Sequence, residues 1–285
     1  MKIILYYFSG TGNTRFIAEK FLEKVVRAGQ DVDGSAGSGT ELEPVETLLV
    51  PVEQAQRDGV VIESDTIFGI GFPVYDLMPP EIVCSFVQTL PEARPGQSAF
   101  VFSTYTSFPL DANRYVIELL QQKGYRVVAE QSFKAPGAVA YVYANPELPV
   151  VRGEAVFGKG TDRTIEAFML QILRGVRTTA PEIRIRPHPL RKFHQAFSRL
   201  VMGTLFYRNL RVSAECTGCG LCVKNCPSAS LSMENGLLRV LDANGCLRCM
   251  RCVVRCPVRA INFTSARRRG DYTRSTIEML YNKEC

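Results

Sequence analysis

Eight cysteines in the C-terminal part of the chain form two copies of one spaced motif. In each copy the cysteines are separated by two, two and three residues, and a proline follows the fourth cysteine. The first copy consists of Cys216, Cys219, Cys222 and Cys226, and the second of Cys246, Cys249, Cys252 and Cys256. A short segment with so many thiols is expected to fold around cross-links or metal.

Three kinds of site are compatible with such cysteines. A disulfide framework belongs to exported domains, but the apolar start of the chain, residues 1–8, breaks into Ser9-Gly10 and is too short for a signal peptide. Zinc sites use two pairs of cysteines, which leaves the third cysteine of each triplet and the one before proline without a role. The doubled pattern therefore favours two 4Fe–4S clusters over zinc.

The cysteine pattern resembles that of bacterial two-cluster ferredoxins over about residues 212–264. In those proteins the fourth cysteine of each copy binds the other cluster. The resemblance implies one cluster held by Cys216, Cys219, Cys222 and Cys256, and a second held by Cys246, Cys249, Cys252 and Cys226. Asn235-Gly236, between two short apolar runs, predicts a hairpin that joins the halves.

The N-terminal part of the chain alternates short apolar runs with helical patterns. Strands are expected over residues 2–8, 48–52, 66–71, 98–103 and 126–133, and helices over 14–28, 79–90, 113–123 and 161–176. Alternation of this kind implies right-handed crossovers and a parallel sheet covered on both faces. The expected fold is α/β, a doubly wound five-stranded parallel sheet followed by a smaller α+β domain.

A loop rich in glycine and hydroxyl groups lies between the first expected strand and helix. Its residues are Ser9, Gly10, Thr11, Gly12, Asn13 and Thr14. Glycines let the backbone fold around a phosphate, and hydroxyls and amides donate hydrogen bonds to it. The loop lacks the Gly-Lys-Ser/Thr of nucleotide-triphosphate loops, and Arg15 stands where the dinucleotide pattern has its third glycine.

This loop resembles the FMN-phosphate loop of flavodoxins, and it follows the first strand as in that family. The resemblance implies a flavin ring between two further loops. By position these are Pro73, Val74 and Tyr75 after the third strand, and Ser103, Thr104 and Tyr105 after the fourth. Tyr75 and Tyr105 are the candidates for stacking on the ring. Flavodoxins often place a tryptophan there, and this chain has none.

Charge and composition divide the chain into four expected regions. These are a flavodoxin-like domain over 1–176, a linker over 177–211, a ferredoxin domain over 212–266 and a basic tail over 267–285. Residues 1–180 hold 16 basic and 21 acidic residues, a net charge of −5, and residues 181–285 hold 18 and 7, a net charge of +11. An amphipathic helix over 191–207 is expected to pack between the domains, and contact with a membrane surface is the alternative.

Together the two halves resemble the fused flavodoxin–ferredoxin proteins of anaerobic bacteria and archaea. The resemblance implies an electron-transfer protein that relays electrons between two 4Fe–4S clusters and FMN, with a redox protein, possibly an acidic one, as donor or acceptor. With no transmembrane segment expected, the predicted location is the cytoplasm.

One alternative is a flavin-dependent reductase of a small molecule, in which the clusters serve as an internal wire. No acid–base constellation stands out for it, because both histidines, His188 and His194, fall in the linker. Another is a redox-sensing or nucleic-acid-binding module, prompted by Arg267-Arg268-Arg269. No nucleic-acid-binding motif accompanies those charges, so a nucleic acid partner is not expected.

Overall fold

The computed structural model describes residues 2–30, 45–60, 62–63, 65–143, 156–177, 183, 210–242, 245–263 and 270–283. Five strands form one sheet in the order β2-β1-β3-β4-β5. They are β1 (Lys2–Tyr7), β2 (Glu46–Pro51), β3 (Thr66–Pro73), β4 (Ser98–Tyr105) and β5 (Arg126–Lys134). Every neighbouring pair is parallel, which confirms the expected doubly wound sheet. The strand order reverses between β1 and β3, where ligands bind in open α/β sheets.

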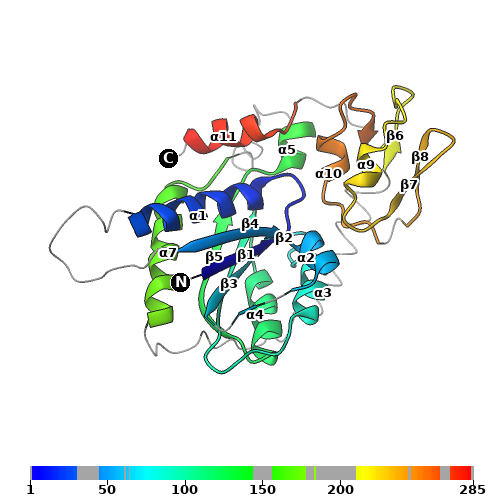
Figure 1. The fold of residues 1–285 in the computed structure, drawn as a ribbon. Coiled ribbons are helices and arrows are strands. Elements are labelled where there is room, and N and C mark those ends of the chain that lie inside the picture. Colours follow the sequence, from blue (N-terminus) through cyan, green and yellow to red (C-terminus); the bar gives the residue numbers. More distant parts are fainter. Residues whose placement is uncertain are drawn as a thin grey trace.

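Helices cover both faces of the sheet (Figure 1). One face carries α1 (Asn13–Gln30) and α7 (Thr161–Arg177), and the other carries α2 (Val52–Asp58), α3 (Glu81–Thr89) and α4 (Ala112–Gln122). In β1, Ile3 and Leu5 pack toward the first set of helices, and Ile4 and Tyr6 toward the second. This division follows from the strand period of two residues, because both faces of a parallel strand are buried.

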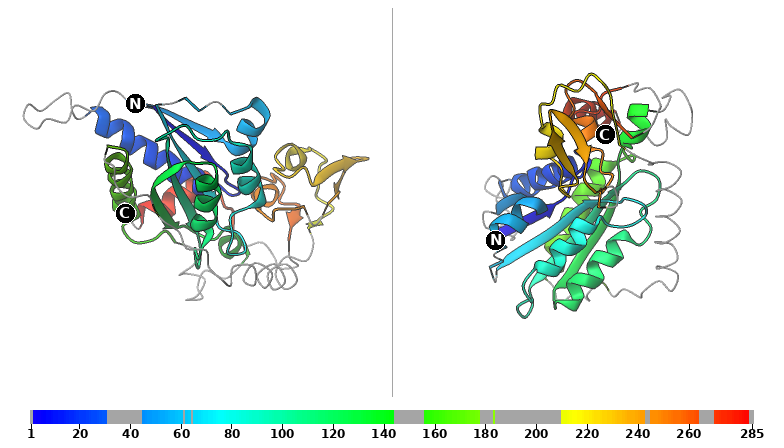
Figure 2. Two further views of the ribbon diagram at one scale, coloured as in Figure 1. Left: turned by 90° about the horizontal axis from the view of Figure 1, so that it is seen from below. Right: turned by 90° about the vertical axis from the view of Figure 1, so that its right-hand side faces the viewer.

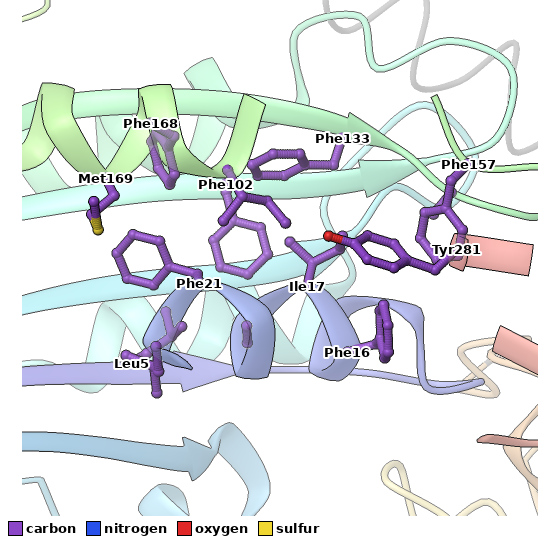
Figure 3. Packing of buried hydrophobic residues seen from close by; sticks show 14 of the residues in the cluster. Leu5, Phe16, Ile17, Phe21, Phe102, Phe133, Phe157, Phe168, Met169 and Tyr281 are labelled. Atoms are coloured by element: carbon purple, nitrogen blue, oxygen red, sulfur yellow. The ribbon is translucent and has the colours of Figure 1, made fainter. Parts of the chain in front are cut away.

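Aromatic rings fill the core between the sheet and helices α1 and α7 (Figure 3). Phe168 lies within 5.8 to 6.4 Å, between ring centroids, of Phe21, Phe100, Phe102 and Phe133. Such pairs contribute about 0.5–1.5 kcal/mol each beyond the area they bury. Gly69 of β3 makes room for them, because a Cβ atom there would overlap the ring of Phe100.

The region that carries both cysteine motifs forms a small unit of its own. Strand β6 (Arg211–Val212) pairs with β9 (Ile261–Asn262), and β7 (Leu231–Glu234) pairs with β8 (Leu237–Val240), both antiparallel. Asn235 and Gly236 join β7 to β8 with φ values of 51° and 75°, which confirms the expected hairpin. The short helices α9 (Leu221–Lys224) and α10 (Arg251–Val254) complete the unit. Its core is Leu231, Leu238, Met250, Val253, Ile261 and Phe263.

The end of the chain returns from the small unit to the large one. Where a basic tail was expected over 267–285, the structure forms helix α11 (Arg274–Asn282), which begins with a capping box at Thr273. Ile277 and Tyr281 of this helix are buried in the core against α1. In Figure 1, α11 lies beside α1 and α5 (Ala138–Tyr143). Residues 270–283 are therefore part of the large unit, because their apolar face completes its core.

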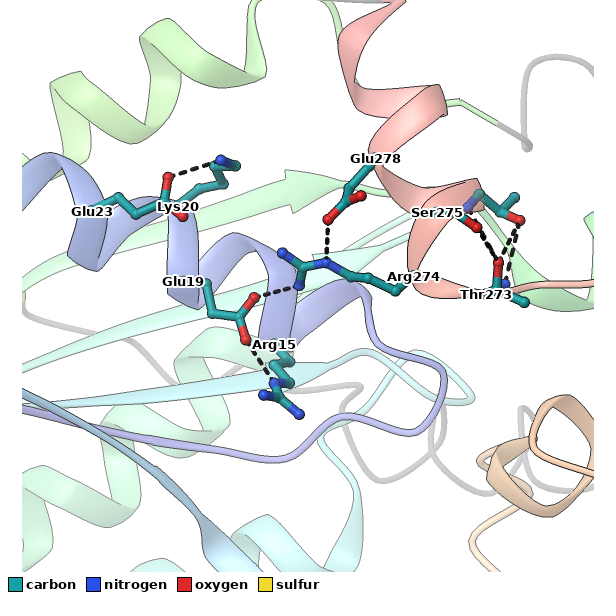
Figure 4. A network of polar contacts seen from close by, with 9 residues as sticks. Arg15, Glu19, Lys20, Glu23, Thr273, Arg274, Ser275 and Glu278 are labelled. Atoms are coloured by element: carbon teal, nitrogen blue, oxygen red, sulfur yellow. Dashed lines mark hydrogen bonds and ion pairs between the residues drawn. The ribbon is translucent and has the colours of Figure 1, made fainter.

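Charged side chains fasten the outer side of α11 to α1 (Figure 4). Arg274 forms ion pairs with Glu19 of α1 and with Glu278 of its own helix. The guanidinium group of Arg274 also lies 4.7 Å from the centre of the Phe16 ring. Exposed ion pairs stabilise a fold by well under about 1 kcal/mol each, so the buried apolar face of α11 contributes most to its docking.

Several sequence expectations fall outside the described residues. They concern the helix over 191–207, the two histidines and the arginine run at 267–269. Helices α2 and α5 were not expected, and both are short, with seven and six residues. Among the described residues, no helix is long and apolar enough to cross a membrane.

Candidate functional site

The two cysteine motifs adopt the same turn. Gly218 and Gly220 in the first copy have φ values of 70°, and Arg248 and Met250, at the equivalent positions of the second, have 52° and 62°. A left-handed conformation is unfavourable for arginine and methionine by about 1–2 kcal/mol. Its occurrence in both copies, with different residues, indicates that the turn itself is required.

Burial and neighbouring thiols raise the pKa values of several motif cysteines, and the expected ligand sets stay predictions. The pKa of the Cys249 thiol is raised to about 11, mainly by burial; Arg251 opposes the rise, and the nearby thiols of Cys246 and Cys226 add to it. Burial also raises the pKa of Cys252, and Cys249, Cys246, Cys226 and Cys222 add to the rise. For Cys222, burial is again the first cause, and Cys219 and Cys216 are the thiols that add to it. Cys226 of the first copy thus affects thiols of the second, and so does Cys222.

These thiols are suited to act as ligands of a positively charged metal core. Crowded and partly buried thiols resist deprotonation, because each thiolate would repel the others in a poorly solvated site. A metal core with positive charge reverses this preference and stabilises the thiolates. Donors to sulfur are already in place: the Ala260 amide donates to Cys256 Sγ over 3.3 Å. That Cys256 completes the group of the first triplet stays a prediction.

The glycine-rich loop lies at the carboxyl end of β1, as expected. The Phe8 amide donates to the Gly71 carbonyl of β3 over 2.9 Å, and the Gly12 amide donates to Ser9 Oγ over 3.1 Å. Gly12 has a φ of 114°, which favours glycine. Helix α1 begins at Asn13, so its unpaired N–H groups and its positive dipole end face this loop. The loop therefore has the arrangement that binds phosphate groups.

The second predicted loop lies against the first. Tyr75 and Met78 exchange two backbone hydrogen bonds of 2.9 Å around a tight turn, in which Asp76 and Leu77 have φ values of 49° and 66°. The ring of Tyr75 packs edge-on against Phe8, with 6.3 Å between centroids. Its hydroxyl approaches Gly10 so closely that a Cβ atom there would overlap it. Tyr75 is therefore in place to border a ligand held by the phosphate loop.

The residues of the third predicted segment, 103–105, contribute to this site to different degrees. Thr104 Oγ1 shares a 2.8 Å hydrogen bond with Thr14 Oγ1, and its carbonyl accepts from the Val74 amide over 2.8 Å. Thr104 thus connects the segment to both other loops. The Ser103 hydroxyl is fully buried and lies 3.1 Å from Ser132 Oγ of β5, inside the sheet. Tyr105 ends β4 and is half-buried.

A residue near the end of the chain holds the phosphate loop in place, which sequence reasoning missed. The Tyr272 hydroxyl donates to Asn13 Oδ1 over 2.7 Å, and Asn13 Nδ2 donates to the Pro136 carbonyl over 2.7 Å. Burial raises the pKa of Tyr272 well above its usual value, so its hydroxyl stays protonated as a donor. Ile277 of α11 also lies next to Gly12, where a Cβ atom would contact it.

The second cysteine motif rests directly on the phosphate loop. Cys249 is only 8% exposed and belongs to the apolar core on the α2–α3–α4 face of the large unit. Its carbonyl oxygen is so close to Gly10 that any larger residue would collide with it. Figures 1 and 2 show the small unit at the end of the sheet where β1 and β3 finish. The second cysteine motif and the predicted phosphate loop are therefore adjacent.

Opposite charges join the two units at this contact. Arg251 Nη2 donates to the Ser9 carbonyl over 2.8 Å and lies 2.7 Å from Glu53 Oε1. The Arg251 guanidinium and the Glu53 carboxylate thus form an ion pair. The Arg251 guanidinium also lies 5.2 Å from the centre of the Phe8 ring. A second pair joins Arg248 to Asp76 over 3.8 Å.

A cavity of about 490 Å³ opens beside this contact, between α2, the start of α1 and the small unit. Its charged lining residues are Arg15, Glu53, Arg57, Lys224, Arg251 and Arg255. Burial lowers the pKa of Arg255, and the positive charges of Arg251 and Arg15 lower it further. The cavity therefore carries surplus positive charge, with one carboxylate among its lining residues.

Comparison with known proteins finds a match to one family model and likenesses to solved structures. Residues 209–261 match the family model of the 4Fe-4S dicluster domain. A flavodoxin from the domain Archaea is 14% identical with a TM-score of 0.38, and covers 62% of this chain and 100% of its own. The Megasphaera elsdenii flavodoxin is 20% identical with a TM-score of 0.35, and covers 56% and 98%. Rubredoxin oxygen:oxidoreductase from Desulfovibrio gigas is 14% identical with a TM-score of 0.40, and covers 62% and 36%. No curated protein matches the chain.

Strand order and the family match define the class of this protein. The order β2-β1-β3-β4-β5 is that of flavodoxin-like sheets, and the phosphate loop lies at the point where that order reverses. The small unit carries the cysteine pattern of the 4Fe-4S dicluster domain. The chain therefore joins an α/β unit with the flavodoxin-like strand order to a unit that matches the 4Fe-4S dicluster domain.

Proposed function

We propose that this protein is an electron carrier that relays electrons between two 4Fe–4S clusters and FMN. The observation that carries the proposal is the direct contact between the second cysteine motif, at Cys249, and the phosphate loop, at Gly10. A flavin held by that loop and a cluster held by that motif would lie side by side. The redox role follows from the chemistry of these two cofactors, which the protein positions and tunes.

The proposed ligands are those expected from the sequence. FMN is held by the loop over 9–14 and bordered by 73–75 and 103–105, where Tyr75 and Thr104 make the closest described connections to the phosphate loop. One cluster is held by Cys216, Cys219, Cys222 and Cys256, and the other by Cys246, Cys249, Cys252 and Cys226. FMN accepts one or two electrons and each cluster carries one, so the pair connects one-electron and two-electron chemistry.

We propose two units rather than a string of independent regions. The first comprises residues 1–176 together with the returning segment 270–283, and the second comprises residues 212–263. The external partner is a redox protein, as donor or acceptor. The basic charge of the C-terminal half favours an acidic partner surface, although Arg248 and Arg251 are already paired with the large unit.

Anaerobic cofactor analysis tests this function directly. Iron, acid-labile sulfide and released flavin are measured on the purified protein, and a visible spectrum is recorded during stepwise reduction. About eight iron and eight sulfide per chain, with one FMN, is the expected result. Zinc in place of iron refutes the ferredoxin half of the proposal. Full clusters without flavin refute the assignment of the phosphate loop.

The cationic cavity favours a second candidate function, a reductase of an anionic small molecule. Its lining includes Cys226, a proposed cluster ligand, beside Lys224 and Arg255. Arg251 Nε is buried there and has no hydrogen-bond partner among the described residues. Reoxidation of the chemically reduced protein by a panel of anionic electron acceptors tests this candidate. Saturable reoxidation that Arg57→Gln weakens favours it, and reoxidation by redox proteins alone refutes it.

A further inference from the structure

The two cysteine motifs are placed differently relative to the phosphate loop. Cys249 of the second copy is buried against the large unit, whereas Cys219, its equivalent in the first copy, is exposed. We propose that the second cluster, held by the second triplet and Cys226, exchanges electrons directly with the flavin, and that the first cluster exchanges them with the external partner. This inference rests on the proposed function, because it requires both kinds of cofactor.

Few residues separate the proposed second cluster from the proposed flavin site. The carbonyl of Cys249 touches the backbone of Gly10, which forms part of the proposed phosphate loop. The Tyr75 hydroxyl approaches the same glycine. One ligand of the second cluster is therefore in van der Waals contact with the loop that holds the flavin, and no third residue intervenes. The absence of a side chain at Gly10 is what permits this approach.

Arg251 acts as the positioning residue for this contact. It follows Met250 in the second motif, donates to the Ser9 carbonyl over 2.8 Å and pairs with Glu53 over 2.7 Å. The equivalent position in the first copy is Leu221, which is 42% exposed. The internal repeat thus has an arginine in the copy that docks and an exposed leucine in the copy that faces away. This asymmetry fixes which cluster lies at the flavin.

Contacts on a second side hold the small unit in this orientation. The Tyr143 hydroxyl of α5 donates to Asn262 Oδ1 of β9 over 3.1 Å. After the small unit, the chain enters the core of the large one at Tyr272 and Ile277. Transfer between the second cluster and the flavin therefore requires no rearrangement of the two units.

In each transfer the second cluster loses one electron and the flavin gains one. Two transfers, together with two protons from solvent, complete the reduction of the flavin. The electrons are supplied by a low-potential redox protein, which reduces the first cluster, and the first cluster reduces the second.

The first test marks each cluster and asks which one responds to the flavin. Cys222→Ser alters the first cluster and Cys246→Ser alters the second, so that their EPR signals can be assigned. The flavin is then removed and restored, and the reduction potential of each cluster is measured by EPR-monitored titration. Restoring the flavin should lower the potential of the second cluster more than that of the first, because the phosphate brings negative charge close to it. If a serine variant loses its cluster, the surviving signal identifies the other.

An equal response of both clusters, or a response of the first alone, overturns the inference. These outcomes are distinct from a failure of the proposed function. A purified protein without flavin, or without iron, refutes that function before any titration is made. A protein that holds both cofactors but shows no preferential response refutes only the order of the clusters.

The second test removes the positioning residue. Arg251→Gln should slow single-turnover electron transfer from the clusters to the flavin by about tenfold and reduce the flavin-dependent shift in potential, because it removes charged contacts at the docking site. Arg239→Gln is the matched control, since Arg239 lies on β8 and pairs with Glu234 of the same hairpin. The double variant Glu53→Gln/Arg251→Gln avoids leaving a buried carboxylate unpaired. If rate and shift are unchanged in both Arg251 variants, Arg251 does not position the cluster.

Discussion

The hydroxyl group of Tyr272 offers a sharp test of how the end of the chain supports the phosphate loop. In Tyr272→Phe the ring remains and only the hydroxyl is lost, which donates to Asn13 Oδ1 over 2.7 Å and also lies 3.3 Å from the Pro136 carbonyl oxygen. Asn13 is 8% exposed, so its amide oxygen would be left without this partner in a buried site. Leaving a buried polar group unsatisfied costs about 1–3 kcal/mol. We therefore expect a loss of unfolding free energy in that range.

The same change should weaken flavin binding. Asn13 lies in the proposed phosphate loop and begins α1, and its side chain is fixed between Tyr272 and the Pro136 carbonyl. Without the Tyr272 contact, Asn13 must be ordered when FMN binds. If this ordering costs about 1.4 kcal/mol, the dissociation constant for FMN rises about tenfold. The assay is titration of flavin-free protein with FMN, followed by the change in flavin fluorescence, alongside denaturant unfolding of the same samples.

Tyr125→Phe is the matched control. Tyr125 is also buried, and its hydroxyl donates over 2.7 Å to the Pro91 carbonyl, in the core on the α2–α3–α4 face. It should lose a similar amount of stability while keeping its affinity for FMN. If both variants lose affinity equally, the effect is general destabilisation. If Tyr272→Phe binds FMN as tightly as the unchanged protein, the reasoning about Asn13 is wrong.

Three further predictions follow from the fold and the cysteine loops. Gly69→Ala should lower the unfolding free energy by about 1–3 kcal/mol in denaturant titrations, because a phenylalanine ring of β4 occupies the space of its Cβ. Gly218→Ala should release the clusters at a lower temperature than Gly220→Ala: both glycines have a φ of 70°, but only the first would contact the Gly236 carbonyl. A hydrogen bond from Lys24 is the main cause that lowers the pKa of Asp162, so its stabilisation is present above about pH 4 and is lost as the pH falls below it. In Asp162→Asn, the unfolding free energy should therefore fall by less between neutral pH and pH values below about 4 than in the unchanged protein. The difference should be less than about 1 kcal/mol, since this carboxylate is partly exposed.

Local patterns in the sequence determined the two kinds of unit. The alternation of strands and helices, the phosphate loop after β1 and the Asn235-Gly236 hairpin depend on residues close together in the chain, and the structure confirms the fold built on them. The cysteine spacing predicted the 4Fe–4S domain that the family match supports. These features could be predicted because short stretches of sequence determine turn geometry and the period of hydrophobic residues. The ligand sets and the stacking tyrosines remain predictions.

Only the tertiary structure decided how the units meet. Arg251 reaches the Ser9 carbonyl, and Tyr272 reaches Asn13, across more than two hundred residues of chain, so no local pattern signals either contact. Residues 267–285 looked like a basic tail because they begin with three arginines at 267–269, whereas Ile277 and Tyr281 of α11 complete a core formed by distant elements. Helix α5 has six residues, too few to display a helical period. A sequence specifies its local elements directly, but the choice of which surfaces touch depends on shape and charge that exist only once the chain has folded.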